Sequence, residues 1–226
     1  GLNFSVHAAM PPFRQTGADA WSLGPEEHGE LLVALLDRYL ASPVKVRIGT
    51  LDSMARSVSA GRGGICTFGE CLGKYLAVGP DGAIYPCQRF AGMPDFVVGD
   101  VARRPSLAEM QASPAWRAFA AREEHVQESC GGCEHFGFCK GGCPYSALVE
   151  AGGALAPTAR DPHCAAYRRS FDAIAERALA EIFDPENLNE VVERPDPELG
   201  LLRRGPLLSL MREGPGRSQP TPTVSD

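Results

Sequence analysis

Residues 130–144 read CGGCEHFGFCKGGCP, so four cysteines fall within fourteen residues. The spacing Cys-x2-Cys-x5-Cys-x3-Cys is close to the run found in bacterial ferredoxins, where the fourth cysteine reaches a second cluster. The glycines beside these cysteines permit tight turns that let several thiolates point inward. The stretch therefore predicts an ordered loop around a metal centre, with neither helical nor strand periodicity.

Four further cysteines complete the pattern, to give eight in the chain. Cys66, Cys71 and Cys87 precede the stretch, and Cys164 follows it. Eight thiolates are what two four-iron clusters need if each iron takes one protein sulfur. The cysteine count and spacing therefore favour a protein with two iron–sulfur clusters.

Zinc and disulfides are the competing uses of these cysteines. A four-thiolate zinc site from Cys130, Cys133, Cys139 and Cys143 is stereochemically reasonable, but zinc modules usually join two tight pairs, and the spacings here are looser. Disulfide frameworks belong mostly to small secreted domains, whereas this chain has 8 cysteines in 226 residues and no signal-peptide pattern. We therefore favour iron–sulfur clusters, with zinc as the main alternative.

The overall composition is that of a soluble globular protein, with 44% apolar and 22% charged residues. The net charge of −6 offers no basic face for a phosphate backbone, so we expect no nucleic-acid partner. No apolar run approaches the roughly 20 residues that cross a bilayer, so we expect no membrane span. Together with the missing export signal, this favours a cytoplasmic location.

Residues 1–60 have the order strand, helix, strand, helix. Apolar alternation predicts strands over 2–8 and 44–48, and an apolar stripe predicts a helix that begins at Pro25. Thr50 is the expected cap of a second helix over 51–59. This order implies a parallel, right-handed crossover, but a sheet this small could not bury both faces. We expect residues 1–60 to be the end of a larger α/β unit.

Residues 61–183 hold every cysteine and predict a small, loop-rich α+β domain. Strands over 75–78 and 83–85 flank a turn with Gly82, and Ser106 and Ser113 are expected to cap two helices. A short helix over 146–150, stopped by two glycines, and a long one over 164–182 complete the domain. Residues 184–226 contain seven prolines and predict an irregular, then disordered, tail.

Three segments give this region a specific family resemblance. Asp81–Cys87, with its Gly-x4-Cys, Cys139–Pro144, and Asp161–Cys164 ahead of an aromatic-rich helix are similar to the C-terminal auxiliary-cluster (SPASM) domain of radical S-adenosylmethionine enzymes. The match covers about residues 60–183, and residues 1–60 more loosely resemble the end of that family's partial (β/α)6 barrel. The resemblance implies two 4Fe–4S clusters, the first held by Cys66, Cys71, Cys87 and Cys143 and the second by Cys130, Cys133, Cys139 and Cys164.

The same resemblance implies an enzyme that modifies a ribosomally made peptide or protein. A 5′-deoxyadenosyl radical would abstract a hydrogen, the product would be a crosslinked or oxidised side chain, and the two clusters would transfer electrons. The Cys-x3-Cys-x2-Cys motif of the superfamily is absent, so we expect S-adenosylmethionine and a third 4Fe–4S cluster in a missing N-terminal part, and no activity from this chain alone. The expected electron donor is a ferredoxin or flavodoxin. The alternatives are a ferredoxin-like electron carrier and a structural zinc-binding interaction module.

One position departs from the relatives that oxidise sulfatases. Those enzymes carry an aspartate base directly after the third cysteine of the domain, where this chain has Gln88. An amide is not a useful proton acceptor at neutral pH, so sulfatase maturation is disfavoured. Arg89 is open to two interpretations, a partner for a peptide carboxylate or for a cluster's negative charge, and a surface salt bridge. The remaining candidates are expected to support the site from outside it or to face solvent rather than to bind metal, and the aromatic ones mostly to pack in the core: His7, His125, His135, His163, Trp116, Phe119, Phe136 and Phe138.

Overall fold

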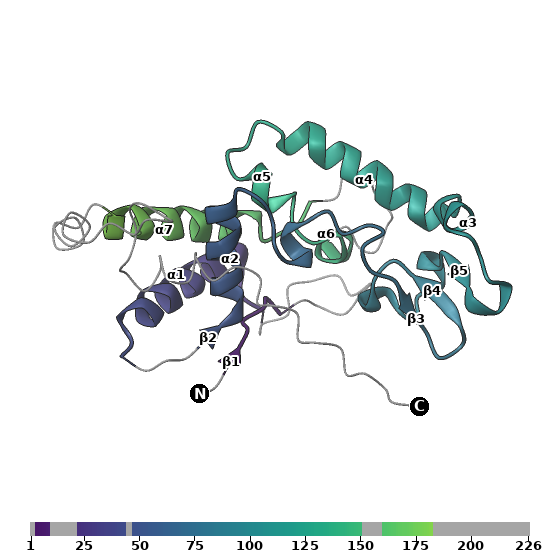
Figure 1. Ribbon diagram of the computed structural model, residues 1–226, viewed down its shortest axis with the longest axis horizontal. Coiled ribbons are helices and arrows are strands. Elements are labelled where there is room, and N and C mark those ends of the chain that lie inside the picture. The colour runs from purple at the N-terminus through teal and green to yellow at the C-terminus, as the bar shows by residue number, and fades with distance from the viewer. Residues whose placement is uncertain (1–2, 10–21, 44–46, 151–159, 183–226) are drawn as a thin grey trace, which may run out of the picture.

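The computed structural model describes residues 3–9, 22–43, 47–150 and 160–182, with backbone only at 149–150 and 181–182. The tail over 184–226 and the glycines at 152–153 therefore lie outside the described residues. Figure 1 shows helices α1, α2 and α7 at one end of the molecule, α3 and a three-stranded sheet at the other, and α5 and α6 between them. The fold mixes helix and sheet, as expected.

The first lobe begins with the parallel pair that the strand–helix–strand order predicts. Strand β1 (Asn3–Phe4) pairs with β2 (Arg47–Ile48), and α1 (Pro25–Ala41) lies between them in the chain. The described strands are shorter than predicted, and residues 44–46 are outside the described ranges. Pro25 is the first residue of α1, where its missing N–H costs nothing, and the Glu27 carboxylate accepts from the Gly24 N–H at 2.9 Å.

The predicted cap of the second helix is wrong. Helix α2 runs over Gly49–Ala60, so Thr50 lies inside its first turn. The Thr50 hydroxyl instead accepts from the Val6 N–H at 3.0 Å and donates to the Val6 carbonyl at 2.8 Å. Because the parallel strands bring Val6 next to Thr50, a long-range contact uses the hydroxyl that would otherwise cap the helix.

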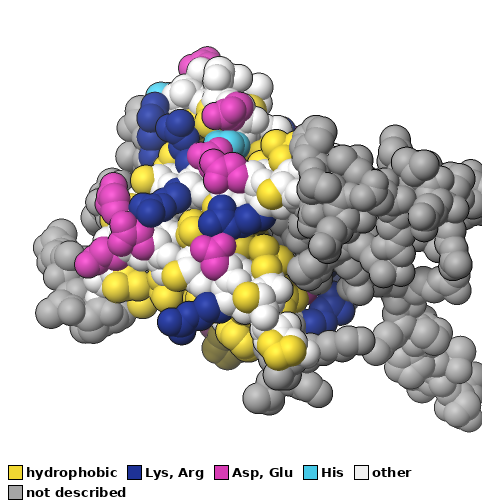
Figure 2. Space-filling model, turned by 90° about the vertical axis from the view of Figure 1, so that its left-hand side faces the viewer, with side chains coloured by type: hydrophobic (Ala, Val, Ile, Leu, Met, Phe, Trp, Pro, Cys, Tyr) yellow, Lys and Arg dark blue, Asp and Glu magenta, His cyan; other side chains and the backbone are white. Residues whose placement is uncertain are grey.

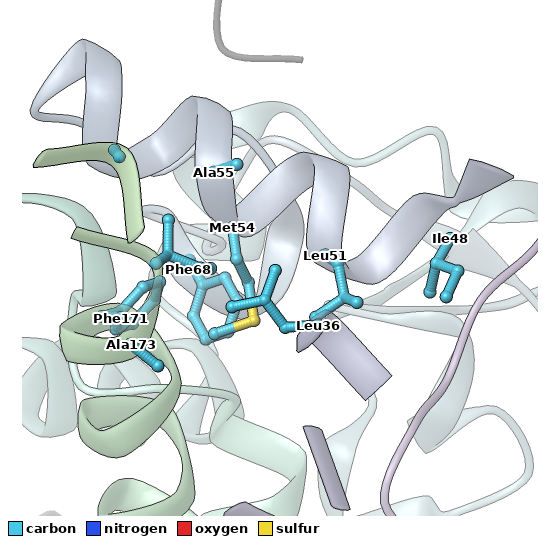
Figure 3. Packing of buried hydrophobic residues seen from close by; sticks show 10 residues of the cluster. Leu36, Ile48, Leu51, Met54, Ala55, Phe68, Phe171 and Ala173 are labelled. Carbon is cyan, nitrogen blue, oxygen red and sulfur yellow. The ribbon is translucent and has the colours of Figure 1, made fainter. Parts of the chain in front are cut away.

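The core of this lobe is built by α7 (Cys164–Ile182), whose bounds are those predicted from its apolar stripe. It packs on α1 and α2. Figure 3 shows Leu36 of α1, Met54 of α2 and Phe171 of α7 meeting around Phe68, which comes from the cysteine-containing region. All four side chains are at most 2% exposed, so α7 and the 3₁₀ turn Cys66–Phe68 bury their apolar surface against each other.

The second lobe contains the predicted hairpin and two capped helices. Strands β3 (Ala77–Val78) and β4 (Ala83–Tyr85) are antiparallel, and β5 (Gly99–Asp100), which was not predicted, pairs with β4. Helices α3 (Leu107–Gln111) and α4 (Pro114–Cys130) begin at the predicted caps Ser106 and Ser113. Their core is aromatic: Tyr85, Phe90, Phe96, Phe119 and, in an adjoining cluster, Trp116.

The segment between the lobes contains more helix than expected. Helix α5 (Phe136–Cys139) forms one turn inside the predicted loop, and α6 (Pro144–Glu150) starts two residues before its predicted first residue. Helix α5 packs on the first lobe, where the Phe138 ring meets Phe171 edge-on at 4.9 Å. Among the described residues, no helix combines the length and apolar character needed to cross a membrane.

Candidate metal centre

All eight cysteines lie in the described part of the chain, and none is paired in a disulfide. Several sit at the ends of elements: Cys87 lies two residues beyond β4, Cys130 and Cys139 end α4 and α5, and Cys164 begins α7. Cys66 and Cys164 are exposed and the other six are half-buried. Helix and strand ends leave the cysteine backbone free to turn, which suits convergence of thiols on shared centres.

The first group of thiols comes from the segment that contains Cys66 and Cys71, from Cys87 after β4 and from Cys143 just before α6. Burial, followed by the negative charges of Cys87, Cys143 and Cys66, raises the pKa of the Cys71 thiol to about 12. Burial also raises the pKa of Cys87. The hydrogen bond from the Arg89 N–H opposes this shift, and the negative charges of Cys143 and Cys66 add to it. These charge effects weaken with distance, which is consistent with the expected grouping of Cys66, Cys71, Cys87 and Cys143.

The other group surrounds a small enclosed cavity of about 50 Å³, lined by Cys130, Cys133, Cys139 and Cys164. This exceeds the roughly 10–15 Å³ that one water requires. Burial raises the pKa of Cys164, and the charges of Cys130 and Cys133 add to that effect while Arg168 opposes it. Each group contains four thiols, the number that a four-iron cube with one protein sulfur per iron needs.

Backbone N–H groups point at the sulfur atoms. The Arg89 N–H donates to Cys87 Sγ at 3.4 Å. Burial raises the pKa of Cys139 to about 12, while N–H groups of Gly141 and Gly142 act in the opposite direction. Lys140, Gly141 and Gly142 all have left-handed backbone, with φ of 53°, 76° and 74°. Successive N–H groups in such a turn form a concavity for negative charge, so this donor set fits a thiolate-bound cluster.

One residue near both groups was given no role by the sequence analysis. Asp161 is 3% exposed and accepts a hydrogen bond from the Cys143 N–H at 2.7 Å. A signal was present, because Asp161 stands three residues before Cys164 in one of the segments that carry the family resemblance. Polar residues in loops are usually solvated, so the sequence alone gave no reason to bury this one.

The histidines divide between surface and interior. His7 is exposed and His125 is half-buried. His135 lines the cavity of the second group, and its Nε2 lies 2.9 Å from a carboxylate oxygen of Asp172 on α7. The His163 ring is 5% exposed and meets His28 edge-on at 5.4 Å. His135 and His163 thus lie beside the cysteines and contact protein groups.

The position after Cys87 faces solvent. Gln88 is exposed, in a short 3₁₀ turn over Gln88–Phe90. The guanidinium of the neighbouring Arg89 lies 5.3 Å from the centre of the Tyr145 ring, within the range of a cation–π contact. Gln88 and Arg89 are thus polar, accessible groups close to the first thiol group.

The far end of the first lobe carries mixed charge. Figure 2 shows basic and acidic side chains interspersed there, with no uniformly basic face. Two cross-helix ion pairs account for part of this: Arg177 with Asp37 at 2.7 Å and Arg169 with Glu30 at 3.2 Å.

Comparison with known proteins identifies the cysteine-rich region. Residues 66–134 match the family model of the SPASM iron–sulfur cluster-binding domain. Two cysteine-type anaerobic sulfatase-maturating enzymes from strains of Clostridium perfringens are 27% and 25% identical, over 61% and 74% of this chain. The chain spans 38% and 45% of their lengths, less than half of each.

Solved structures share the fold. Native anSMEcpe with bound AdoMet aligns with a TM-score of 0.59 at 23% identity, covering 75% of this chain and 46% of that one. The same protein with bound AdoMet and Cp18Cys peptide also gives a TM-score of 0.59, over 75% of this chain and 47% of that one. Residues 66–134 therefore belong to the SPASM iron–sulfur cluster-binding domains, and the chain is similar to part of the cysteine-type anaerobic sulfatase-maturating enzymes.

Proposed function

We propose that this chain is the auxiliary-cluster part of a radical S-adenosylmethionine enzyme that modifies a ribosomally made peptide or protein. One 4Fe–4S cluster would be held by Cys66, Cys71, Cys87 and Cys143, and a second by Cys130, Cys133, Cys139 and Cys164. The observation that carries the proposal is the gathering of eight free thiols into two neighbourhoods of four.

The role proposed for both clusters is electron transfer. With four cysteines for each cluster, no iron is left open to bind a substrate, and a bound cluster supplies the uptake and release of one electron. The chain's own residues then set the environment: the N–H groups of Arg89, Gly141 and Gly142 stabilise negative charge on sulfur. The half-buried thiols Cys71 and Cys139 must each lose a proton to become ligands.

The two-cluster proposal is tested by metal content and by two matched variants. Anaerobically purified protein is analysed for iron, acid-labile sulfide and zinc. Cys87→Ala and Cys164→Ala should each change a different electron paramagnetic resonance signal and lower the iron content by up to about four atoms relative to the parent. Leu107→Ala, at an exposed side chain of α3, keeps every thiol and should change neither. One zinc per thiol group without sulfide favours the zinc module, and loss of the same signal in both cysteine variants refutes the ligand sets.

We further propose that the substrate is a peptide or protein other than a sulfatase cysteine. The support is Gln88, which is exposed next to the first thiol group and whose amide cannot take up a proton at neutral pH. The proposed chemistry is crosslinking or oxidation of a side chain after hydrogen abstraction. A reduced ferredoxin or flavodoxin is the proposed electron donor.

The substrate proposal needs the intact enzyme that contains this chain. It is incubated with S-adenosylmethionine, reduced flavodoxin and a sulfatase-derived cysteine peptide, and the peptide mass should stay unchanged. A precursor peptide of the correct class should instead stimulate release of 5′-deoxyadenosine and change mass. Oxidation of the sulfatase cysteine would contradict the proposal for Gln88 but leave the two-cluster proposal intact.

A further inference from the structure

Asp161 is a buried acid that neither proposed ligand set uses. Its side chain is 1% exposed, and it lies three residues before α7. A carboxylate without compensating hydrogen bonds or charges would strongly destabilise such a site. The contacts that Asp161 makes therefore need an explanation beyond chance burial.

These contacts join the two proposed cluster sites. One carboxylate oxygen, Oδ2, accepts from the Cys143 N–H at 2.7 Å, and the other, Oδ1, accepts from the His163 N–H at 2.9 Å. The Asp161 backbone carbonyl accepts from the Cys164 N–H at 3.3 Å. Cys143 belongs to the first proposed set and Cys164 to the second, so one residue holds a member of each.

The local backbone is built to let the carboxylate approach. Gly142 has φ of +74°, and a Cβ placed there would lie 2.6 Å from both Cβ and Oδ2 of Asp161. Only glycine leaves this space free. Asp161 also lines the small cavity that Cys130, Cys133, Cys139 and Cys164 surround. Its carboxylate is thus held against the second thiol group by backbone geometry.

The charge of Asp161 acts more on one group than on the other. Burial is the main cause of the raised pKa of Cys139 and of Cys164, and Asp161 contributes to both shifts. For Cys71 and Cys87, in the first group, the leading charges come from other cysteines. Several basic groups lie near this carboxylate. Arg160 and Arg168 line the same cavity, and His163 Nδ1 lies 3.4 Å from Asp161 Oδ1. Arg122 is the buried one among the arginines: it is 3% exposed and donates to the Gly141 carbonyl at 3.1 Å. Burial lowers the pKa of Arg122, and Asp161 is the first of the charges that oppose this.

We propose that Asp161 is a positioning residue that fixes Cys143 against the second site and lowers the reduction potential of the cluster held there more than that of the other cluster. A nearby negative charge opposes the arrival of an electron, and it does so most for the closer cluster in a poorly solvated site. Arg122 acts in the opposite direction. The proposal rests on the two-cluster function proposed above.

The test is a redox titration of both cluster signals in Asp161→Asn. Asparagine keeps an oxygen that can accept from the Cys143 N–H but removes the charge. At a fixed applied potential, the reduced-to-oxidised ratio of the second cluster should rise about tenfold, equivalent to about 59 mV for one electron, and that of the first cluster should rise less. Asp52→Asn is the matched control, because Asp52 is also 1% exposed but is held by Tyr39 and Arg47. It should move neither potential.

A second variant should change the reduced-to-oxidised ratio in the opposite direction. Arg122→Gln removes a buried cation that interacts with Cys143 and Cys130, one member of each proposed set, so the reduced-to-oxidised ratio of both clusters should fall. If Asp161→Asn fails to fold, Asp161→Glu keeps the charge and should leave the second cluster's ratio unchanged, and a tenfold rise there would overturn the proposal. Full iron content with both potentials unchanged, or an equal rise in both, overturns the role of Asp161. Iron content that shows fewer than two clusters in the parent protein overturns the proposed function instead, so the two failures are distinguishable.

Discussion

Replacing Gly142 with alanine should destabilise the protein by about 2.5–5 kcal/mol, because two separate costs add. The first is conformational: φ is +74°, and an alanine in left-handed backbone costs about 1–2 kcal/mol. The second is steric, since the new methyl would lie 2.6 Å from Cβ and Oδ2 of Asp161. Asp161 cannot move without stretching its hydrogen bond to the Cys143 N–H, and a bond to a charged acceptor is worth about 1.5–3 kcal/mol.

Two other glycines separate these costs. Gly61 follows the last residue of α2, has φ of +62° and has nothing within 4 Å of an added Cβ. Gly61→Ala should therefore cost only the conformational part of the free energy, about 1–2 kcal/mol. Gly132 has nothing within 4 Å and no left-handed backbone, so Gly132→Ala should change stability by less than about 0.5 kcal/mol.

The assay is urea unfolding of the reconstituted proteins under anaerobic conditions, followed by circular dichroism. Differences in midpoint, taken with a common denaturant slope, give the differences in unfolding free energy. The order of stability should be parent and Gly132→Ala, then Gly61→Ala, then Gly142→Ala. A Gly142 variant as stable as the Gly61 variant would refute the close approach of Asp161.

Three further predictions concern the core, an ion pair and a thiol. Phe171→Ala should cost about 3–5 kcal/mol in urea unfolding because the ring is 1% exposed, whereas Leu179→Ala, at a side chain 53% exposed, should cost far less. Hydrogen bonds from Arg177 lower the pKa of Asp37, so this ion pair stabilises the fold above the ordinary carboxyl pKa near 4, and the stabilisation is lost as the pH falls. Asp37→Asn should therefore cost about 0.5 kcal/mol at pH 7 and nothing near pH 2. Burial and the neighbouring thiols raise the pKa of Cys71 to about 12. Above about pH 8.5 the thiol ionises in the unfolded chain but not in the folded one, so the metal-free, reduced protein should lose stability as the pH rises. Cys71→Ala should weaken this pH dependence of stability, and an unchanged pH profile in the variant would contradict the prediction.

Local sequence signals predicted the elements whose stability is itself local. The Ser106 and Ser113 caps bond the N–H groups of Glu109 and Trp116, three residues on, and α7 has its predicted bounds because one apolar stripe spans it. The hairpin followed from a glycine turn between two short apolar runs, and Gly82 indeed has φ of +85°. In each case the deciding interactions lie within a few residues of one another.

The missed features depend on contacts distant in the sequence. Strand β5 is Gly99–Asp100, too short for any alternation, and only its pairing with β4 defines it. Thr50 has the residue type of a helix cap, but its hydroxyl instead hydrogen-bonds the backbone of Val6, 44 residues away. Asp161 likewise bonds to Cys143 across 18 residues. Periodicity contains no information about such partners, so the spacing of cysteines could suggest ligands but not the groups that hold and charge them.

The order of the cysteines along the chain explains why one acid can reach both proposed sites. Cys143 stands four residues after Cys139, yet it is assigned with Cys66, Cys71 and Cys87, while Cys139 is assigned with the later Cys164. The chain must therefore cross from one site to the other within the left-handed turn at 140–142, and glycines at 141 and 142 make that crossing short. Two sites that share so short a connection cannot be positioned independently. Asp161 accepts the Cys143 N–H with its carboxylate and the Cys164 N–H with its backbone carbonyl, which is a direct way to fix the separation over which an electron would pass.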